Sequence, residues 1–419
     1  MSLRDRLPAP IDAVFDGDEE DTCGCTTAFA DGDLLVDASE CEADGRLAHS
    51  PECRETVIGA LTERDVDAVR TESGGVVRAY EDEAAALLVA AGRFVESVRF
   101  HDERLAALAR RDPLAACREA TGRADAVADI AAESGLAALA DRSDSYRQAL
   151  PAAVGPTVSR WRVRTAPPAG AKVRATRELE SGATVRRYEP EHGVDRYHLV
   201  PPERELSPAA LSVLASAHER LATGEFEGGD RAPARAVRAV VERDCGCEEV
   251  PTERIATALE KHARGFGLLE DLFADPAVSD AFVTAPATSN PVRVTVDGET
   301  MGTNLRLTES GVAAFASRFR RESGRAFSRA DPTLDATVRI AGRRVRVAGV
   351  TDPPSEGPAF AFRAQDEDVW TLPALVANGT LPAEAAGLLS VAVERGSAVL
   401  VAGPRGAGKT TLLGALLWE

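Results

Sequence analysis

Lysine, aromatic residues and long apolar runs are all scarce in this chain of 419 residues. The only lysines are Lys172, Lys261 and Lys409, and aromatic residues make up 5% of the sequence. Surfaces that bind nucleic acid need basic charge and stacking aromatic rings, so this composition argues against a nucleic-acid partner. No run reaches the roughly 18 consecutive apolar residues that span a bilayer. We therefore expect a cytoplasmic protein without direct membrane insertion, which contacts a membrane only through partner proteins.

The charge that the chain does carry is strongly acidic. Asp and Glu number 67 against 49 Lys and Arg, which gives a formal net charge of −18. Carboxylates keep a protein surface hydrated, and concentrated salt screens their mutual repulsion. Together with the preference for arginine over lysine, the composition predicts a halophilic protein from a GC-rich genome. An ordinary acidic soluble protein is the alternative.

Seven cysteines are present, and a reducing compartment disfavours disulfides between them. A cluster near the N-terminus could bind one structural zinc ion and so stabilise a segment with little core of its own. Scattered buried thiols are the alternative interpretation. His49 could replace one thiol, and Cys245 and Cys247 could supply or compete for ligands. The candidate zinc ligands are Cys23, Cys25, Cys41 and Cys53.

A complete GxxxxGK[S/T] motif lies near the C-terminus and predicts a phosphate-binding loop. Its glycines allow backbone amides to approach phosphate oxygens, and the helix that follows points its positive end at them. Lys409 would neutralise β- and γ-phosphate charge, and the Thr410 hydroxyl would ligate Mg²⁺. We expect a buried strand over 397–402 before the loop and a helix over 410–417 after it. The sequence therefore predicts binding of ATP and Mg²⁺ by Gly403, Pro404, Arg405, Gly406, Ala407, Gly408, Lys409, Thr410 and Thr411.

Periodicity and loop composition predict a multidomain protein of mixed α+β and α/β class. Helical spacing dominates 54–150, and the Pro- and Gly-rich stretch 155–183 is interpreted largely as a linker. A hairpin is expected around Ala341 and Gly342, and a helix capped by Ser207 is expected through residue 221. The predicted parts are a Cys-rich segment over 1–53, a helical module over 54–150, an α+β region over 155–275, a second α+β domain over 276–364 and the phosphate-loop region over 365–419.

Several different short motifs lie between residue 188 and the end of the chain. They are found at 264–276 (RGFGLLEDLFADP), 285–292, 323–325, 331–336 (DPTLDA), 342–345 (GRRV), 379–381 and 412–417. Their order resembles the type II/type IV secretion ATPases, the motors of pili, archaella and secretion machines, and most of all the archaeal branch. The resemblance implies a PAS-like domain over 276–364 above a RecA-like ATPase domain that begins at 365. It also implies a homo-hexamer that works with a membrane platform protein. Arg344 would then be a catalytic arginine that contacts phosphate together with Lys409, and Arg363 a second contact.

Two departures from that family qualify the expectation. Pro404 and Arg405 replace small polar residues of the loop. The later strands of such an ATPase, with its Mg²⁺-associated carboxylate and its water-activating glutamate, are not found in the sequence. We therefore expect a chain truncated just after the loop and inactive in hydrolysis by itself. The alternative is a catalytically inert adaptor that docks to a partner through its cysteine and helical modules.

Overall fold

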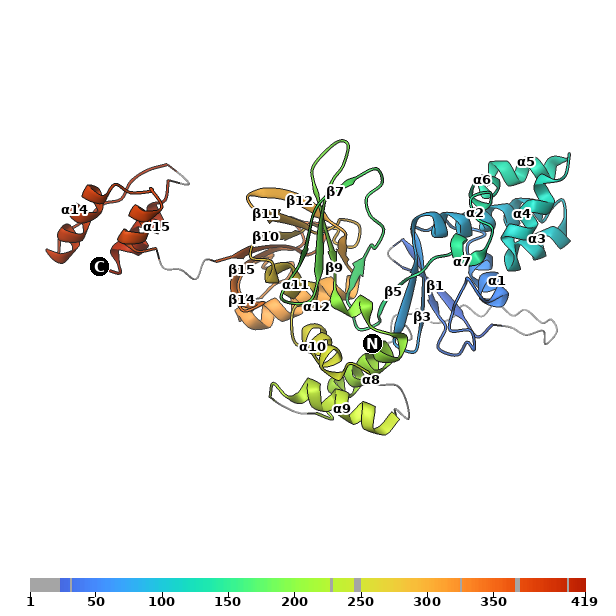
Figure 1. Ribbon diagram of the computed structural model, residues 1–419, viewed down its shortest axis with the longest axis horizontal. Helices are drawn as coiled ribbons and strands as arrows, with labels where there is room; N and C mark the ends of the chain where they lie inside the picture. Colours follow the sequence, from blue (N-terminus) through green and yellow to red (C-terminus); the bar gives the residue numbers. More distant parts are fainter. Residues whose placement is uncertain are drawn as a thin grey trace.

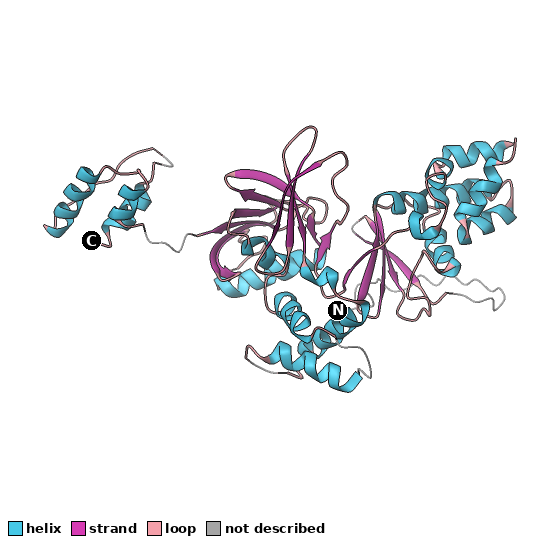
Figure 2. Ribbon diagram, viewed as in Figure 1, coloured by secondary structure: helices cyan, strands magenta, loops and turns pink. Residues whose placement is uncertain are grey.

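The structure is a computed structural model that describes residues 23–30, 32–226, 229–244, 250–324, 326–365, 370–404 and 407–419. It is a mixed α/β arrangement with two large sheets and several helical groups (Figures 1 and 2). The mixed, multidomain class predicted from the sequence is confirmed at this level, and the PAS-like character of 276–364 stays a prediction. No helix in the described part of the chain is long and apolar enough to cross a membrane.

The N-terminal part is a five-stranded sheet covered by helices. Its strands follow the order β1-β2-β3-β4-β5, and only the β2–β3 pair is parallel. The strands are β1 (Thr26–Ala30), β2 (Asp33–Asp37), β3 (Ala68–Ser73), β4 (Val76–Tyr80) and β5 (Ala153–Pro156). The helices are α1 (Pro51–Ala60), α2 (Asp82–Val98), α3 (Glu103–Arg111), α4 (Pro113–Thr121), α5 (Ala126–Glu133), α6 (Leu136–Ala140) and α7 (Tyr146–Ala149).

One hydrophobic core holds this part together from Cys25 to Leu150. The boundary expected after Cys53 therefore lies within α1 and inside this core. Strands β3 and β4 lie within 54–150, which was expected to be a helical module. Their pairing with β2 and β5, which come from distant positions in the sequence, explains the difference, because it satisfies backbone groups that a local pattern does not reveal.

The central part is a nine-stranded sheet in the order β14-β15-β16-β10-β11-β12-β9-β8-β7, and only the β12–β9 pair is parallel. The stretch 172–178 was expected to be linker, but it forms the edge strand β7. The strands are β7 (Lys172–Glu178), β8 (Thr184–Glu189), β9 (Arg196–Val200), β10 (Val278–Val283), β11 (Arg293–Val296), β12 (Glu299–Thr303), β14 (Thr333–Ile340), β15 (Arg343–Val350) and β16 (Ala359–Ala364). A separate antiparallel pair joins β6 (Trp161–Val163) to β13 (Leu305–Leu307).

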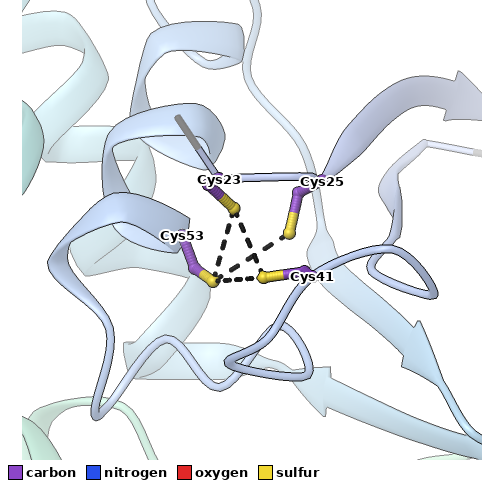
Figure 3. A group of neighbouring side chains, drawn as sticks. All are labelled: Cys23, Cys25, Cys41 and Cys53. Carbon is purple, nitrogen blue, oxygen red and sulfur yellow. Dashed lines mark hydrogen bonds between the residues drawn. The ribbon is translucent and has the colours of Figure 1, made fainter. Parts of the chain in front are cut away.

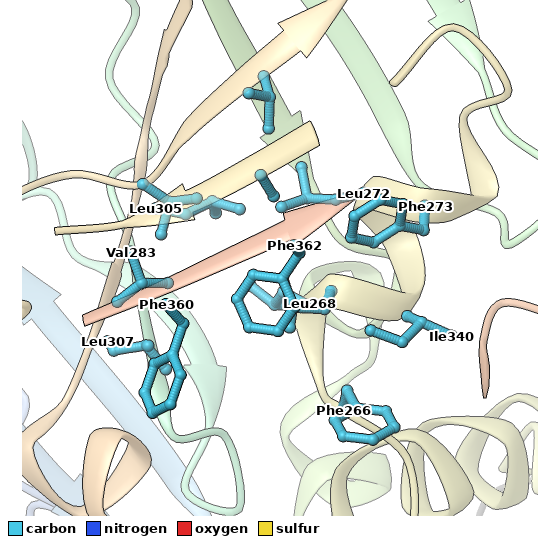
Figure 4. Close-up of a cluster of buried hydrophobic side chains, with 14 of the residues drawn as sticks. Phe266, Leu268, Leu272, Phe273, Val283, Leu305, Leu307, Ile340, Phe360 and Phe362 are labelled. Carbon is cyan, nitrogen blue, oxygen red and sulfur yellow. The ribbon is translucent and has the colours of Figure 1, made fainter. Parts of the chain in front are cut away.

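One face of the central sheet carries an extensive hydrophobic core. Helices α11 (Leu268–Ala274) and α12 (Glu309–Ser323) pack against this face, and Figure 4 shows apolar side chains of α11 beside those of the strands. Phe319 stacks with Phe266 at 5.5 Å between ring centroids and lies 5.7 Å from Phe362. Strand β14 alternates exposed and buried positions along its whole length, so its other face is open.

The hairpin predicted around Ala341 and Gly342 is confirmed. Strands β14 and β15 pair in register from Thr333↔Val350 to Ile340↔Arg343. The two turn residues have φ values of 49° and 76°, which is the left-handed geometry that a two-residue hairpin turn requires. The sequence signal was strong here because the turn is local.

Two helical groups complete the chain. The first consists of α8 (Pro208–Ala222), α9 (Ala232–Asp244) and α10 (Thr252–Ala263), preceded by the short helix η2 (Pro202–Glu205). Ser207 caps α8 as expected, because its side chain accepts a hydrogen bond from the Ala210 amide. The second group consists of α13 (Leu372–Ala377), α14 (Ala383–Glu394) and α15 (Lys409–Leu416) around a small core.

The strand predicted over 397–402 is not formed in this structure. These residues have no regular secondary structure, and the Leu400 side chain is 92% exposed. A strand needs a neighbour to accept and donate its backbone hydrogen bonds, and no described residue pairs with this segment. The apolar run by itself therefore did not determine a strand.

Candidate functional site

The loop predicted to bind phosphate lies directly before α15. Gly408 occupies the N-cap position with φ of 75°, a conformation that favours glycine, and Lys409 is the first helical residue. The Lys409 Nζ atom donates a hydrogen bond of 2.6 Å to the Pro404 carbonyl oxygen, so the side chain folds back over the loop. The Ala407 amide donates to the same carbonyl at 3.3 Å. The predicted loop residues Arg405 and Gly406 lie outside the described residues.

This arrangement fits an anionic ligand. The amides of the first turn of α15 have no partner within the helix, and the helix dipole adds partial positive charge at that end. Thr410 is exposed and Thr411 half-buried in that same turn. The Lys409 ammonium is held at the loop by a neutral carbonyl, so a phosphate oxygen would be a stronger partner for it.

The two predicted arginines lie on the open face of the central sheet. Arg363 is opposite Arg346 in the β15–β16 ladder, and Arg344 lies two residues before Arg346 on the same face. The Arg344 side chain is exposed and makes no hydrogen bond or ion pair with any described residue. The Arg363 Nε atom lies 2.6 Å from Oδ1 of Asp280.

The neighbouring Arg343 has a different, structural role. Its guanidinium donates to three backbone carbonyls at the end of α11 and the start of β10, those of Phe273, Asp275 and Val278. The Arg343 side chain therefore holds α11 and β10 together. The structure does not bring Arg344 or Arg363 to the loop, because no hydrogen bond or ion pair joins described residues 370–419 to the central sheet.

The four predicted cysteines do come together (Figure 3). Their sulfur atoms all lie within 4.8 Å of one another, although they come from the segment before β1, the loop after β2 and the first turn of α1. The hydrogen bond from Cys25 lowers the pKa of Cys53 to about 5, and burial raises the pKa of Cys23 to about 11. His49 is not in the group, and Cys245 and Cys247 lie outside the described residues.

A buried ionic cluster was missed by the sequence reasoning. The Lys261 Nζ atom lies 2.7 Å from Glu203 Oε2 and 2.7 Å from Asp271 Oδ2, and the His262 Nε2 atom lies 2.6 Å from Glu203 Oε1. All four side chains are at most 9% exposed. Burial alone would raise the pKa of Glu203, but Lys261 and His262 lower it well below its usual range. The one available signal was that Lys261 is a rare lysine in an arginine-rich chain.

Comparison with known proteins finds a match in the C-terminal part of the chain. Residues 268–418 match the family described as type II/IV secretion system protein. We call these residues the secretion-family segment. The segment starts at the first residue of α11 and contains Arg344, Arg363 and the predicted phosphate-binding loop. The cysteine group and three residues of the ionic cluster lie before it.

Two curated relatives match the chain over about the same share. A protein of Mycobacterium tuberculosis described as "Putative conjugal transfer protein" is 34% identical over 169 residues, which are 38% of this chain and 46% of that protein. An uncharacterized protein of Methanocaldococcus jannaschii is 29% identical over 160 residues, or 38% of this chain and 28% of that one. The chain thus spans less than half the length of these relatives.

A solved structure, the Legionella pneumophila ATPase DotB, overlaps 36% of this chain and 39% of its own at 18% identity. The TM-score of 0.24 is too low to indicate a shared fold.

Proposed function

We propose that this protein is the ATP-binding portion of a motor ATPase of the type II/IV secretion class, which powers pilus assembly or protein secretion by hydrolysing ATP in a ring. The observation that carries the proposal is the complete phosphate-binding loop at the N-terminus of α15, inside the secretion-family segment. The match to a Mycobacterium tuberculosis protein described as "Putative conjugal transfer protein" supports a role in a transfer process.

When the triphosphate binds, its oxygens would replace the present hydrogen-bond partner of Lys409. The Lys409 ammonium would leave the Pro404 carbonyl and pair with a phosphate oxygen, while the first-turn amides of α15 donate to the same group. Thr410 is the residue that would hold Mg²⁺, because its hydroxyl follows the lysine directly. The ion, when bound, supplies charge neutralisation at the phosphates.

Arg344 and Arg363 would stabilise the charge that spreads over the γ-phosphate during transfer. Both are exposed on the open face of the central sheet, where a ligand can reach them, and Arg344 has no competing partner among the described residues. In this structure they are separate from the loop. The proposal therefore requires that the loop of this chain, or that of a second copy in a homo-hexamer, packs against this face when nucleotide binds. Its cytoplasmic location and a membrane platform partner are part of the same proposal.

The test compares Lys409→Ala with Lys172→Ala, a matched control at an exposed position on β7. We expect Lys409→Ala to weaken binding of a fluorescent ATP analogue in the presence of Mg²⁺ by at least about tenfold, because one charge-assisted contact is lost. The control should bind like the unmodified protein. Equal affinity of both variants would contradict the assignment of the loop.

A second measurement separates a motor from an inert adaptor. If Arg344 acts on the transition state, Arg344→Ala in a full-length protein that carries the complete ATPase domain should lower the rate of ATP hydrolysis more than it lowers ATP affinity. Arg306→Ala, which also removes an exposed arginine from a strand of the same region, is the control. Nucleotide binding with no detectable hydrolysis in that full-length protein would favour the adaptor instead.

A further inference from the structure

We infer that Cys23, Cys25, Cys41 and Cys53 bind one zinc ion through four thiolates. The four sulfurs come from three separate segments of the chain, yet all lie within 4.8 Å of one another. This site is remote in sequence from the secretion-family segment and goes beyond the proposed ATP-dependent function. It would be structural, because four protein ligands fill a tetrahedral zinc ion and leave no position for a substrate.

The distances between the sulfurs are those expected when four thiolates bind one metal ion. Zinc–sulfur bonds of about 2.3 Å in a tetrahedron place the sulfurs roughly 3.8 Å apart. The structure has Sγ–Sγ distances of 3.5 Å for Cys23–Cys41 and Cys41–Cys53, 3.6 Å for Cys23–Cys53 and 3.9 Å for Cys25–Cys53. A disulfide needs sulfurs about 2.05 Å apart. In an iron–sulfur cluster the thiolates bind different iron atoms and stand further apart.

The backbone around the sulfurs is shaped for this close approach. A Cβ atom on Gly24 would lie 2.3 Å from the carbonyl oxygen of Glu40. Only glycine at this position therefore lets Cys23 and Cys25 lie so close to the loop that carries Cys41. The Cys53 amide donates to the Ser50 side chain, which caps α1. Cys53 therefore lies in the first turn of a ten-residue helix, where the helix dipole favours a thiolate.

A bound ion would link the segment before β1, the loop over 38–50 and α1 at one point. This loop contains only turns, and β1 is an edge strand paired with β2 alone. Hydrogen bonds hold the loop to its neighbours near Asp44 and Leu47, where Arg78 donates to the Asp44 carbonyl and the Leu47 amide donates to Tyr80 Oη at 2.9 Å. Zinc would add a connection through Cys41, nearer the start of the loop.

The experiment measures metal in the purified 419-residue chain by mass spectrometry, with zinc, iron, cobalt and copper counted separately. We expect about one zinc per chain. Cys41→Ser and Cys23→Ser should each reduce bound zinc by at least about tenfold, because each removes one of four ligands. Cys117→Ser is the matched control, since Cys117 is a buried thiol in α4 outside the group, and it should retain the zinc. A Cys245→Ser/Cys247→Ser double variant should retain it too.

Cobalt gives a second readout that does not depend on how well the variants fold. Chelation followed by addition of Co²⁺ should give the unmodified protein the thiolate-to-cobalt absorption bands of a tetrahedral all-sulfur site, and zinc should displace them. Gly24→Ala, which keeps all four thiols, should weaken cobalt binding by at least about tenfold because the added methyl group meets the Glu40 carbonyl.

Several outcomes would overturn the inference. These are a purified protein that neither contains zinc nor takes up cobalt, iron in place of zinc, and zinc retained by both Cys23→Ser and Cys41→Ser. Loss of zinc from the Cys245→Ser/Cys247→Ser variant would also overturn it, because the ligand set would then be wrong. The proposed ATP site is tested separately, since Lys409→Ala should keep its zinc and Cys41→Ser should keep its affinity for ATP.

Discussion

Replacing Lys261 with methionine would leave two buried carboxylates without the cation that they share. Methionine keeps much of the apolar stem of the lysine but removes its charge and its hydrogen-bond donors. Glu203 and Asp271 both lie 2.7 Å from the Lys261 Nζ atom, and their side chains are 1% and 0% exposed. Neither carboxylate can turn to water, so the variant must either hold two adjacent buried charges or bind a proton.

The size of the effect follows from this burial. Removing one partner of a buried ion pair lowers the free energy of unfolding by about 3–5 kcal/mol, because the remaining charge stays desolvated. For a unit of some 200 residues this corresponds to a fall in Tm of about 6–20 °C. The matched control is Arg254→Met, which breaks the exposed Arg254–Glu205 pair between the same two elements, α10 and η2. An exposed pair contributes under about 1 kcal/mol.

The fluorescence of Trp161 can report the unfolding of the central part alone. Trp161 is buried in the core of the central sheet, and the chain has only two other tryptophans, Trp370 and Trp418. In a Trp370→Phe/Trp418→Phe background, urea titration followed by fluorescence therefore measures the central part without the C-terminal helices. A Lys261→Met loss no larger than that of Arg254→Met would refute the reasoning.

The pH dependence gives the same prediction a second test. Burial already raises the pKa of Asp271 with Lys261 in place, and loss of Lys261 should raise it further. A group whose folded-state pKa is raised contributes stability that is present at low pH and lost as pH rises. The loss of stability in Lys261→Met should therefore be smaller near pH 5 than near pH 8. Adding Asp271→Asn should restore part of the stability, because the uncompensated Asp271 charge is then gone, whereas Glu203 keeps His262 as a partner.

Three further predictions concern other parts of the molecule. Burial lowers the pKa of His218 to about 4, below its unfolded value near 6.5, so stability falls as pH drops through this window, and His218→Gln should flatten the dependence of Tm on pH there. Gly267→Ala should cost about 1–3 kcal/mol in urea titration, because Gly267 has φ of 60° and a Cβ atom would lie 2.6 Å from Trp161 Nε1. The net charge of −18 predicts that Tm rises as KCl increases from about 0.1 to 2 M, and a flat or falling Tm would contradict a halophilic origin.

Features fixed by neighbours in sequence could be predicted. The Ser207 cap and the Ala341–Gly342 turn depend on hydrogen bonds and φ values within a few residues, and both are found as expected. The helix after the predicted phosphate-binding loop belongs to the same class, since α15 begins at Lys409, one residue before the expected helix over 410–417. In each case the residue type itself restricts the backbone.

Features that depend on distant partners could not be predicted. All seven residues of β7 are exposed, so the strand shows no alternation of buried and exposed side chains that would reveal it. Likewise, β9 pairs in parallel with β12 across a boundary expected after residue 275. For the segment 397–402 a strand was predicted that is not formed. Its apolar residues suggested a strand, but no described residue pairs with it.

The four-cysteine group and the buried ionic cluster differ in how far the sequence could predict them, because their residue types differ. Cysteine has few functions in a reducing compartment, so four of them near one another suggested a shared ion before any distance was known. Glu203 and Lys261 are 58 positions apart, and carboxylates are abundant in this chain, so the rarity of Lys261 did not reveal which carboxylate it would meet. Only the fold brings η2, α10 and α11 together around one lysine.

The ionic cluster also determines which parts of the molecule move as one. Asp271 lies in α11, the first helix of the secretion-family segment, whereas Glu203 and Lys261 precede that segment. Buried charges accept few alternative arrangements, because any displacement leaves a carboxylate desolvated and unpaired. The group α8–α10 is therefore fixed to the central sheet. No such contact joins described residues 370–419 to that sheet, so a loop that reaches Arg344 must approach as a separate body. Lys261→Met should thus lower the stability of the central part while the ATP affinity of the loop stays unchanged.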